Sequence, residues 1–253
     1  MSTCPKCGNS ISPDEVICPF CGYRIGFEEI EEIFEEVPEE RRPPKPSLTK
    51  IRLLFTSPRE TFKELAYFPE NKGTFLILFA CASLSALTIL VAFSHLKIEM
   101  NYLYWFGLFI AGFIANLILY MIMWLFLSLS YWIFTRLVYG KIGFKRVSSF
   151  LGYALITFVL ANLLILILAS TIVPQIPSET LTEMEASTII QTIFNIPPFN
   201  IYNMIFFPFL VGTGILYAYG IAEEFKTSFT KALVSSLFFT SLIIIFIYAM
   251  LYF

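Results

Sequence analysis

The sequence has little charge for its length and almost no histidine. Of its 253 residues, 14% are charged, where a soluble domain carries about a quarter, and His95 is the only histidine. The near absence of imidazole leaves little material for histidine-based catalysis or for a histidine-rich metal centre. Hydrophobic residues make up 57% of the chain and aromatic residues 17%. This composition is typical of a membrane protein and gives poor support to most enzyme classes.

Cysteines are also few, but four of the five stand in a regular pattern. The segments CPKCG at 4–8 and CPFCG at 18–22 are two C-x2-C knuckles separated by ten residues. Two such turns can supply four thiolates to one tetrahedral ion, which is the arrangement that structural zinc prefers. We therefore expect residues 1–26 to form a zinc ribbon that binds Zn2+. Its predicted ligands are Cys4, Cys7, Cys18 and Cys21.

Other interpretations of the knuckles fit less well. A redox C-x-x-C motif needs a surrounding βαβ domain, which this short segment does not predict. A disulfide pair needs an oxidising compartment, which the cytoplasmic N-terminus predicted below does not provide. A nucleic-acid contact is also disfavoured, because Lys6 and Arg24 are the only basic residues of the ribbon and residues 28–40 hold eight glutamates. A module of this size cannot bury a core large enough to fold, so the metal must supply the folding free energy. We expect a protein-docking or structural ribbon.

Two segments connect this ribbon to the apolar part of the chain. Residues 27–46 form an acidic and Pro-rich linker that ends in the semi-rigid sequence RRPPKP. Residues 47–72 predict an amphipathic segment lying on the membrane surface. Its apolar face holds Leu48, Ile51, Leu54 and Phe55, and its other face holds Lys50 and Arg52.

A helix start is predicted inside this amphipathic segment. Ser57 suits the N-cap, Pro58 the first helical position, and Glu60 the third position of a capping box. We expect a short second helix to follow.

Long stretches without charged residues make up the rest of the chain. They run over residues 73–96, 100–135, 147–178, 186–222 and 232–253. A helix of about 20 residues crosses the hydrocarbon core of a bilayer, so each stretch predicts at least one transmembrane helix. In the fourth stretch, prolines and asparagines at 195–200 leave about 199–222 as the span. The predicted fold is an all-α polytopic membrane bundle with five transmembrane helices over 73–253 and a small N-terminal zinc ribbon.

The second stretch is long enough for a hairpin of two helices. Residues 113–138 contain neither Gly nor Pro, and a hairpin buried in lipid would leave backbone N–H and C=O groups unpaired. We therefore expect one long helix. In the fourth span we expect Pro208 to kink the helix, and Gly212 and Gly214 are the best candidates for a flexible or broken segment.

The basic residues predict the orientation in the membrane, because Lys and Arg are retained on the cytoplasmic side during insertion. Only Lys97 flanks the side opposite the N-terminus. The flanking residues on the N-terminal side are Lys72, Arg136, Lys141, Lys145, Arg146, Lys226 and Lys231. We expect a multi-pass protein of the cell membrane, with the N-terminus in the cytoplasm and the C-terminus outside.

Polar residues inside the spans carry no charge, which disfavours a proton pump or an ion-coupled transporter. We interpret them as hydrogen-bonding groups that hold helices together rather than as a substrate path. They are Ser83, Ser85, Thr88, Asn116, Asn162, Ser235, Ser236 and Thr240. Small residues also recur at steps of four, which predicts close helix packing within one chain or in a homo- or hetero-oligomer. The two small-residue stripes are Gly107, Ala111 and Ala115, and Gly214, Ala218 and Ala222.

A carboxylate pair at the end of the fourth span is the nearest approach to a catalytic motif. Glu223 and Glu224 are adjacent on a helix, so their side chains point about 100° apart. We interpret them as a solvated cap beside Lys226. We expect no catalytic residue and no cofactor besides the metal.

Three segments resemble the Yip1 domain family. They are LLFTSPRETFKEL at 53–65, RLVYGKIGFKRVSSFLGYAL at 136–155 and AYGIAEEFKTSFTKA at 218–232. The resemblance implies a five-span fold with a cytoplasmic N-terminus. The chain lacks the Asp-Leu-Tyr-Gly-Pro motif of eukaryotic trafficking members, and Thr157 stands where a Gly-Tyr-x-x-x-Pro pattern has proline. GTPase binding is therefore not carried over. The zinc-ribbon head looks more prokaryotic, an archaeal source being one option.

Two function hypotheses remain open from the sequence. The first is a non-enzymatic membrane protein whose cytoplasmic zinc ribbon docks a protein partner, while the bundle organises the membrane or helps to assemble membrane proteins. The alternative is a small transporter or permease subunit with a gate near residues 208–214. Neither hypothesis includes a nucleic-acid partner.

Overall fold

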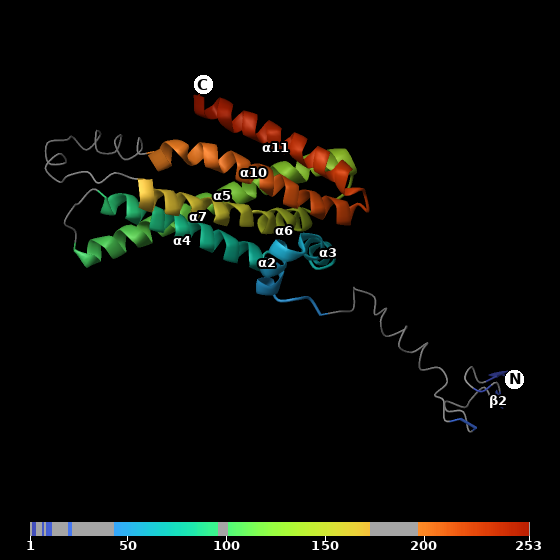
Figure 1. The fold of residues 1–253 in the computed structure, drawn as a ribbon. Helices are drawn as coiled ribbons and strands as arrows, with labels where there is room; N and C mark the ends of the chain where they lie inside the picture. The colour runs from blue at the N-terminus through green and yellow to red at the C-terminus, as the bar shows by residue number, and fades with distance from the viewer. Residues whose placement is uncertain are drawn as a thin grey trace, which may run out of the picture. The chain divides into compact units, whose positions relative to one another are not determined.

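The computed structural model describes residues 2–3, 7, 9–11, 20–21, 43–95, 101–172 and 197–252. The chain divides into two compact units, Met1–Pro44 and Lys45–Phe253 (Figure 1).

The N-terminal unit contains a small β-hairpin. Strand β1 (Ser2–Thr3) pairs in antiparallel fashion with β2 (Ser10–Ile11), so that Ser2 lies opposite Ile11 and Thr3 opposite Ser10. The residues between the two strands include the whole first knuckle, because Cys4 directly follows β1 and Cys7 precedes β2.

The larger unit begins with two short helices, α2 (Ser47–Thr56) and α3 (Pro58–Tyr67). Ser57 separates them and is the N-cap of α3, with Pro58 at the first helical position, as predicted. The predicted capping box is wrong in one respect. Within this described segment the Ser57 side chain makes no capping hydrogen bond, and the Ser57 carbonyl instead accepts from the backbone N–H of Glu60 at 3.1 Å.

Five helical segments are long and apolar enough to cross a membrane, which confirms a multi-pass fold with five spans. The helices are α4 (Lys72–Ser94), α5 (Tyr102–Tyr139), α6 (Phe144–Ala154), α7 (Ile156–Ile172), α10 (Pro197–Glu224) and α11 (Phe229–Tyr252). The helices α6 and α7 together form the third span. Helix α5 is continuous over 38 residues, so the prediction of one long helix is also confirmed.

The interrupted helix lies in the third span rather than in the fourth. Leu155 separates α6 from α7, and its carbonyl accepts from the backbone N–H of Phe158 at 2.9 Å. By contrast, α10 runs unbroken from Pro197 to Glu224, so the expectation of a broken segment at Gly212 and Gly214 is wrong. The kink at Pro208 stays a prediction.

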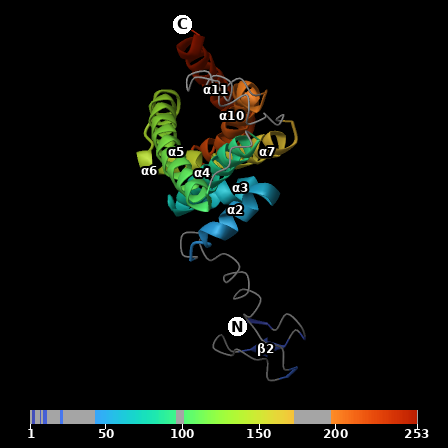
Figure 2. The ribbon, with the colours of Figure 1, turned by 90° about the vertical axis from the view of Figure 1, so that its left-hand side faces the viewer.

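The spans are arranged as an arc that nearly closes on itself. Helix α4 packs between α5 and α7, and α10 packs between α7 and α11 (Figure 2). The two outer members of this arc, α5 and α11, meet near one end, where the rings of Phe134 and Phe239 stack with centroids 4.3 Å apart. Helices α3 and α6 pack against α10 at the same end of the bundle.

We call this the basic end of the bundle, because the spans begin or end there beside lysines and arginines. Lys72 starts α4, Arg136 lies in the last turn of α5, and Lys226 lies between α10 and α11 (Figure 1). Lys97, which the sequence places at the other end, lies outside the described residues.

Large buried side chains concentrate toward the basic end. The Phe62 ring of α3 contacts Phe150 of α6 at a centroid distance of 6.1 Å and stacks with Tyr219 of α10 at 6.4 Å. Phe62, Leu65 and Phe150 are fully buried. The pair α2–α3 is therefore an integral layer of the bundle and not only a surface segment.

Candidate functional site

Of the four predicted metal ligands, two lie in described turns. Cys7 lies between β1 and β2, Cys21 lies in a second turn, and both residues are exposed. Cys4 and Cys18 lie outside the described residues, so the four-ligand set stays a prediction. The donor set nevertheless suits zinc, because two turns with two thiolates each can supply the four cysteine ligands of a tetrahedral structural site.

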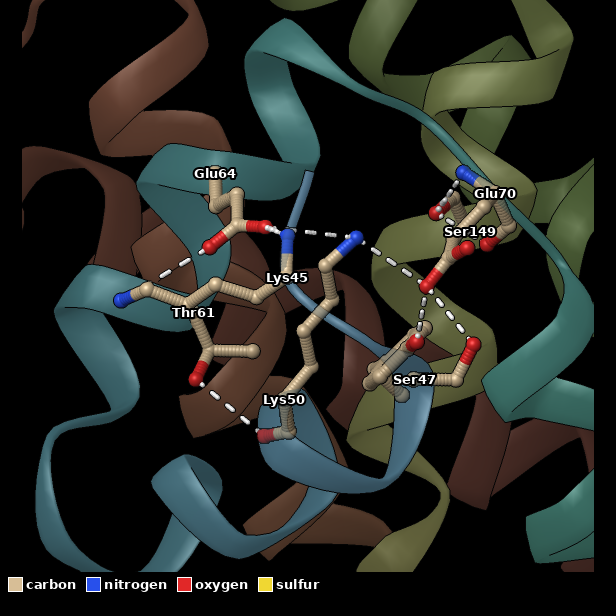
Figure 3. A network of polar contacts seen from close by, with 8 residues as sticks. Lys45, Ser47, Lys50, Thr61, Glu64, Glu70 and Ser149 are labelled. Carbon is tan, nitrogen blue, oxygen red and sulfur yellow. Dashed lines mark hydrogen bonds and ion pairs between the residues drawn. The ribbon is translucent and has the colours of Figure 1, made fainter. Parts of the chain in front are cut away.

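Lys50 is the centre of a polar network at the basic end (Figure 3). Its side chain is fully buried, and its Nζ lies 3.1 Å from Oε1 of Glu70 and 3.5 Å from Oε1 of Glu64. The prediction that Lys50 belongs to an outer polar face of the amphipathic segment is therefore wrong. On α2 the exposed residues include two predicted apolar ones, Leu48 and Phe55.

Two further contacts involve Lys45, which precedes α2, and Thr61 of α3. The backbone N–H of Lys45 donates to Glu64 at 2.6 Å, and the Thr61 hydroxyl donates to the Lys50 carbonyl at 3.3 Å. Both contacts join the start of α2 to α3, because Thr61 and Glu64 lie on α3. Lys50 therefore holds two helices and the start of the first span together.

Glu70 connects this network to the third span. Its Oε1 accepts from the Ser47 hydroxyl at 3.1 Å (Figure 3). The same atom accepts from the Tyr153 hydroxyl at 2.7 Å. The Ser149 hydroxyl donates to the Glu70 carbonyl at 2.7 Å. Burial alone would raise the pKa of the Glu70 carboxyl, but the hydrogen bonds from Tyr153, Lys50 and Ser47 and the charge of Lys50 lower it below its usual value. Glu70 is therefore held as a carboxylate.

The carboxylates of Glu223 and Glu224 are ion-paired, so their interpretation as a solvated cap is wrong. Glu223 is nearly buried and accepts from Nε of Arg59 on α3 at 2.8 Å. Glu224 pairs with Arg146 of α6. As predicted, the two side chains point in different directions, and each one pairs with a different helix. Together they fasten α3 and α6 to the end of α10.

Several polar residues inside the spans bond from one helix to another, as predicted. Ser85 of α4 donates to Oδ1 of Asn162 on α7 at 2.7 Å, and the Tyr120 hydroxyl of α5 donates to the same atom at 3.0 Å. On α11, the Ser236 hydroxyl donates to the Gly214 carbonyl of α10 at 2.7 Å. The Tyr139 hydroxyl of α5 donates to Ser235 at 2.9 Å.

Three of the predicted residues bond within their own helix instead. Ser83 donates to the Phe79 carbonyl, Thr88 to the Leu84 carbonyl and Asn116 to the Gly112 carbonyl. In each case the side chain donates its hydrogen bond to a carbonyl of the preceding turn, so this bond does not join two helices.

Two buried tyrosines, which were not predicted from the sequence, complete the contacts between spans. Tyr131 of α5 pairs with Thr240 of α11 at 2.6 Å, and Tyr217 of α10 pairs with Thr135 of α5 at 2.8 Å. Both tyrosines are fully buried. Their position inside apolar stretches, away from the ends where membrane aromatics gather, is the signal that could have found them.

The two small-residue stripes have different surroundings. A Cβ at Gly214 of α10 would overlap the Thr240 side chain, and Ala218 is fully buried, so close packing of this stripe is confirmed. At Gly107 of α5 a Cβ would meet nothing within 4 Å, and Ala111 and Ala115 are exposed. In the bundle, the stripe on α5 therefore packs against no other helix of the described part of the chain.

Two family models match the chain, in agreement with this geometry. A zinc-ribbon domain matches residues 3–25, which supports zinc binding by the N-terminal unit. The Yip1 domain matches residues 51–251, from α2 through the fifth span. A comparison with curated proteins and one with solved structures find no match. Because the Yip1 match covers well over half of the 253 residues, including all five spans, the chain belongs to the Yip1 domain family.

Proposed function

We propose that the chain is a non-enzymatic membrane protein whose zinc ribbon docks a protein partner at the cytoplasmic membrane surface. The Yip1 bundle holds this ribbon at the membrane and organises the surrounding membrane or its proteins. The observation that carries the proposal is the combination of two modules in one chain. The zinc-ribbon domain matches residues 3–25, and the Yip1 domain matches residues 51–251, which hold the five spans.

The cytoplasmic position of the ribbon is inferred from charge. Lys72, Arg136 and Lys226 lie at the end of the bundle where α2 and α3 pack, which is the end nearest in sequence to the ribbon. Because basic flanking residues are retained in the cytoplasm, this end and the N-terminus are cytoplasmic and the C-terminus lies outside. A reducing cytoplasm also keeps cysteines available to a metal.

The four-cysteine ligand set gives the proposal its chemical basis. Cys4, Cys7, Cys18 and Cys21 hold the ion as thiolates, and the ion supplies the folding free energy of a module too small to fold by burial. A partner that reads the folded ribbon then depends on zinc. The eight glutamates of residues 28–40 keep phosphate backbones away, which favours a protein over a nucleic acid.

A zinc-dependent capture from native membranes tests this function. We would purify the full chain from crosslinked membranes beside a variant with Cys4, Cys7, Cys18 and Cys21 changed to Ser. The zinc content of each protein is measured in the same samples. We expect the wild type to hold one zinc ion per chain, as a ribbon with four cysteine ligands does. We also expect it to retain a defined protein that the variant loses.

A cysteine outside the ribbon supplies the matched control. Cys81 is buried in α4, so Cys81→Ala removes a thiol without touching the ribbon. This control should keep both the zinc and the partner. Recovery of the same proteins by the four-serine variant would overturn the docking proposal and leave the ribbon as a passive cap.

A further inference from the structure

A cavity of about 500 Å3 opens at the basic end, beside the ion pair of Arg59 and Glu223. It lies between α3 and the turn that joins α10 to α11. Its polar lining comes from Arg59, Glu223, Lys226, Thr227 and Ser228. The fourth span ends at Glu224 and α11 begins at Phe229, so the cavity lies at the depth where lipid headgroups meet the bundle.

Two cations, Arg59 and Lys226, line this cavity. Arg59 of α3 keeps 78% of its side chain exposed and engages Glu223 through Nε. A guanidinium has five N–H donors, so the contact through Nε leaves the terminal NH2 groups able to donate to a further acceptor. The Nζ of Lys226 lies 5.7 Å from the centre of the Tyr67 ring, on the last turn of α3. A ring face attracts the ammonium and holds it beside α3.

The turn itself brings further donors to the cavity. Lys226 adopts φ = 49°, in the left-handed region that residues with a side chain rarely occupy, and the N–H of Thr227 donates to the Ala222 carbonyl at 3.2 Å. This turn brings the Thr227 and Ser228 residues into the lining. The Ser228 carbonyl accepts the N–H of Ala232 at 3.2 Å, so α11 begins there with its first N–H groups unused by the helix.

The remaining lining is apolar. The Tyr219 and Phe229 rings stack with centroids 4.3 Å apart, and Ala222 also lines the cavity. Among the described residues of the lining, the only carboxylate is that of Glu223, whose charge is balanced by Arg59. Lys226 therefore leaves the lining with a net positive charge, beside hydroxyl donors and an apolar wall.

We propose that this cavity binds a phosphate group, carried by a phospholipid headgroup or by a soluble molecule. Arg59 and Lys226 take the phosphate oxygens as charged donors, and the hydroxyls of Thr227 and Ser228 take further oxygens. The α11 N-terminus adds a favourable dipole. The wall of Tyr219 and Phe229 contacts the apolar part of the ligand.

Binding to the full-length protein in a non-ionic detergent tests this site. The probes are dihexanoyl phosphatidylglycerol and inorganic phosphate, and native mass spectrometry measures the bound fraction. The main variant is Lys226→Asn, because Asn tolerates the left-handed turn while the charge is removed. We expect its affinity for the lipid probe to fall about tenfold, since a charge-assisted hydrogen bond is lost.

A second variant removes space without changing charge. Ala222→Met fills the cavity and should weaken lipid binding to a similar extent. The matched control is Lys145→Gln, which removes an exposed lysine of α6 at the same end of the bundle. It should bind like the wild type. Melting temperatures within a few degrees of the wild type show that each variant is folded.

The outcomes separate the two sources of phosphate. Loss of phosphatidylglycerol binding in Lys226→Asn and Ala222→Met, with no competition by inorganic phosphate, supports a lipid headgroup. Binding of inorganic phosphate that both variants lose supports a soluble ligand. Equal binding by every protein, or an equal loss in Lys145→Gln, overturns the proposal, because only general attraction between charges would then remain.

Discussion

The basic end of the bundle and its membrane-spanning middle are fastened by different chemistry. At the basic end, Lys50, Arg59 and Arg146 each pair with a carboxylate. In the middle, the links between helices are neutral hydroxyl, amide and backbone groups such as those of Ser85, Tyr120 and Asn162. A charge at the bilayer centre costs about 2.5 kcal/mol or more, whereas headgroups and water reach the end of a span. The position in the membrane therefore decides which polar group can hold two helices.

One helix takes part in both kinds of contact. Helix α10 offers Glu223 and Glu224 at the basic end and Thr213 and the Gly214 carbonyl in the middle. The Thr213 hydroxyl pairs with Thr157 of α7 at 2.7 Å. This contact uses the position where the family pattern has proline, beside the interruption at Leu155. A polar side chain thus joins the third and fourth spans at a site where proline could form no side-chain hydrogen bond.

The largest effect should come from steric overlap at the junction of the two regions. A Cβ at Gly152 of α6 would overlap the side chain of Thr74 on α4, next to the Tyr153 contact with Glu70. We expect Gly152→Leu to lower the free energy of unfolding by about 3 kcal/mol, because the leucine side chain can be accommodated only if α4 or α6 shifts. Unfolding in mixed micelles measures the change.

The control is Gly107→Leu on α5, where a Cβ meets nothing within 4 Å. Its effect should stay within about 0.5 kcal/mol. Equal destabilisation by the two substitutions would mean that loss of glycine itself, and not the contact with Thr74, is responsible.

The next effect should come from breaking the ion pairs of Lys50. Removing one partner of a buried pair costs about 3 to 5 kcal/mol, but Glu64 and Glu70 keep 14% and 24% of their side chains exposed. Water then solvates part of the orphaned charge, so we expect Lys50→Met to cost about 2 kcal/mol. Arg52→Met on the exposed side of α2 is the matched control and should cost little. A similar loss in both variants would refute a special role of the buried lysine.

A smaller effect is expected in the membrane-spanning middle. Asn162 accepts from both Ser85 and Tyr120, and Asn162→Leu leaves the two donors without this acceptor. Hydrogen bonds between membrane helices contribute about 1 kcal/mol, so we expect a loss of that size. Asn116, which donates to the Gly112 carbonyl of its own helix, supplies the control. Asn116→Leu should be nearly neutral, and a loss as large as that of Asn162→Leu would count against the link between helices.

Local patterns in the sequence predicted the spans and the ribbon. Apolar stretches of the length of a bilayer give the helices directly, and the absence of Gly and Pro over residues 113–138 is enough to predict the continuity of α5. The spacing of Cys4, Cys7, Cys18 and Cys21 likewise indicates a zinc ribbon, because all four cysteines lie within a short segment of the sequence. Such features need no knowledge of the tertiary structure.

Contacts between distant segments were not predictable in the same way. Lys50 looks like a surface residue from its own helix, because its partner Glu70 is 20 residues away and Tyr153 is 83 residues beyond Glu70. The interruption at Leu155 has no Gly or Pro directly beside it, and the nearest one, Gly152, lies within α6. Gly214 looked like a flexible point, whereas its lack of a side chain is needed for the approach of Thr240. These features depend on which helices meet.

The smallest effect should come from protonating the basic end. Hydrogen bonds from Tyr153, Lys50 and Ser47 hold the pKa of Glu70 below its usual 4.5, although burial opposes them. The folded state then binds protons more weakly than the unfolded state, so the stabilising contribution is complete above pH 4.5 and is lost as the pH falls through the folded pKa. Stability curves from pH 7 to pH 3 should show this loss in the wild type. Glu70→Gln should be less stable at pH 7 and should show a shallower decline. If stability declined equally steeply in both proteins, other carboxylates and not Glu70 would cause the acid sensitivity. The prediction for the basic end would then be wrong.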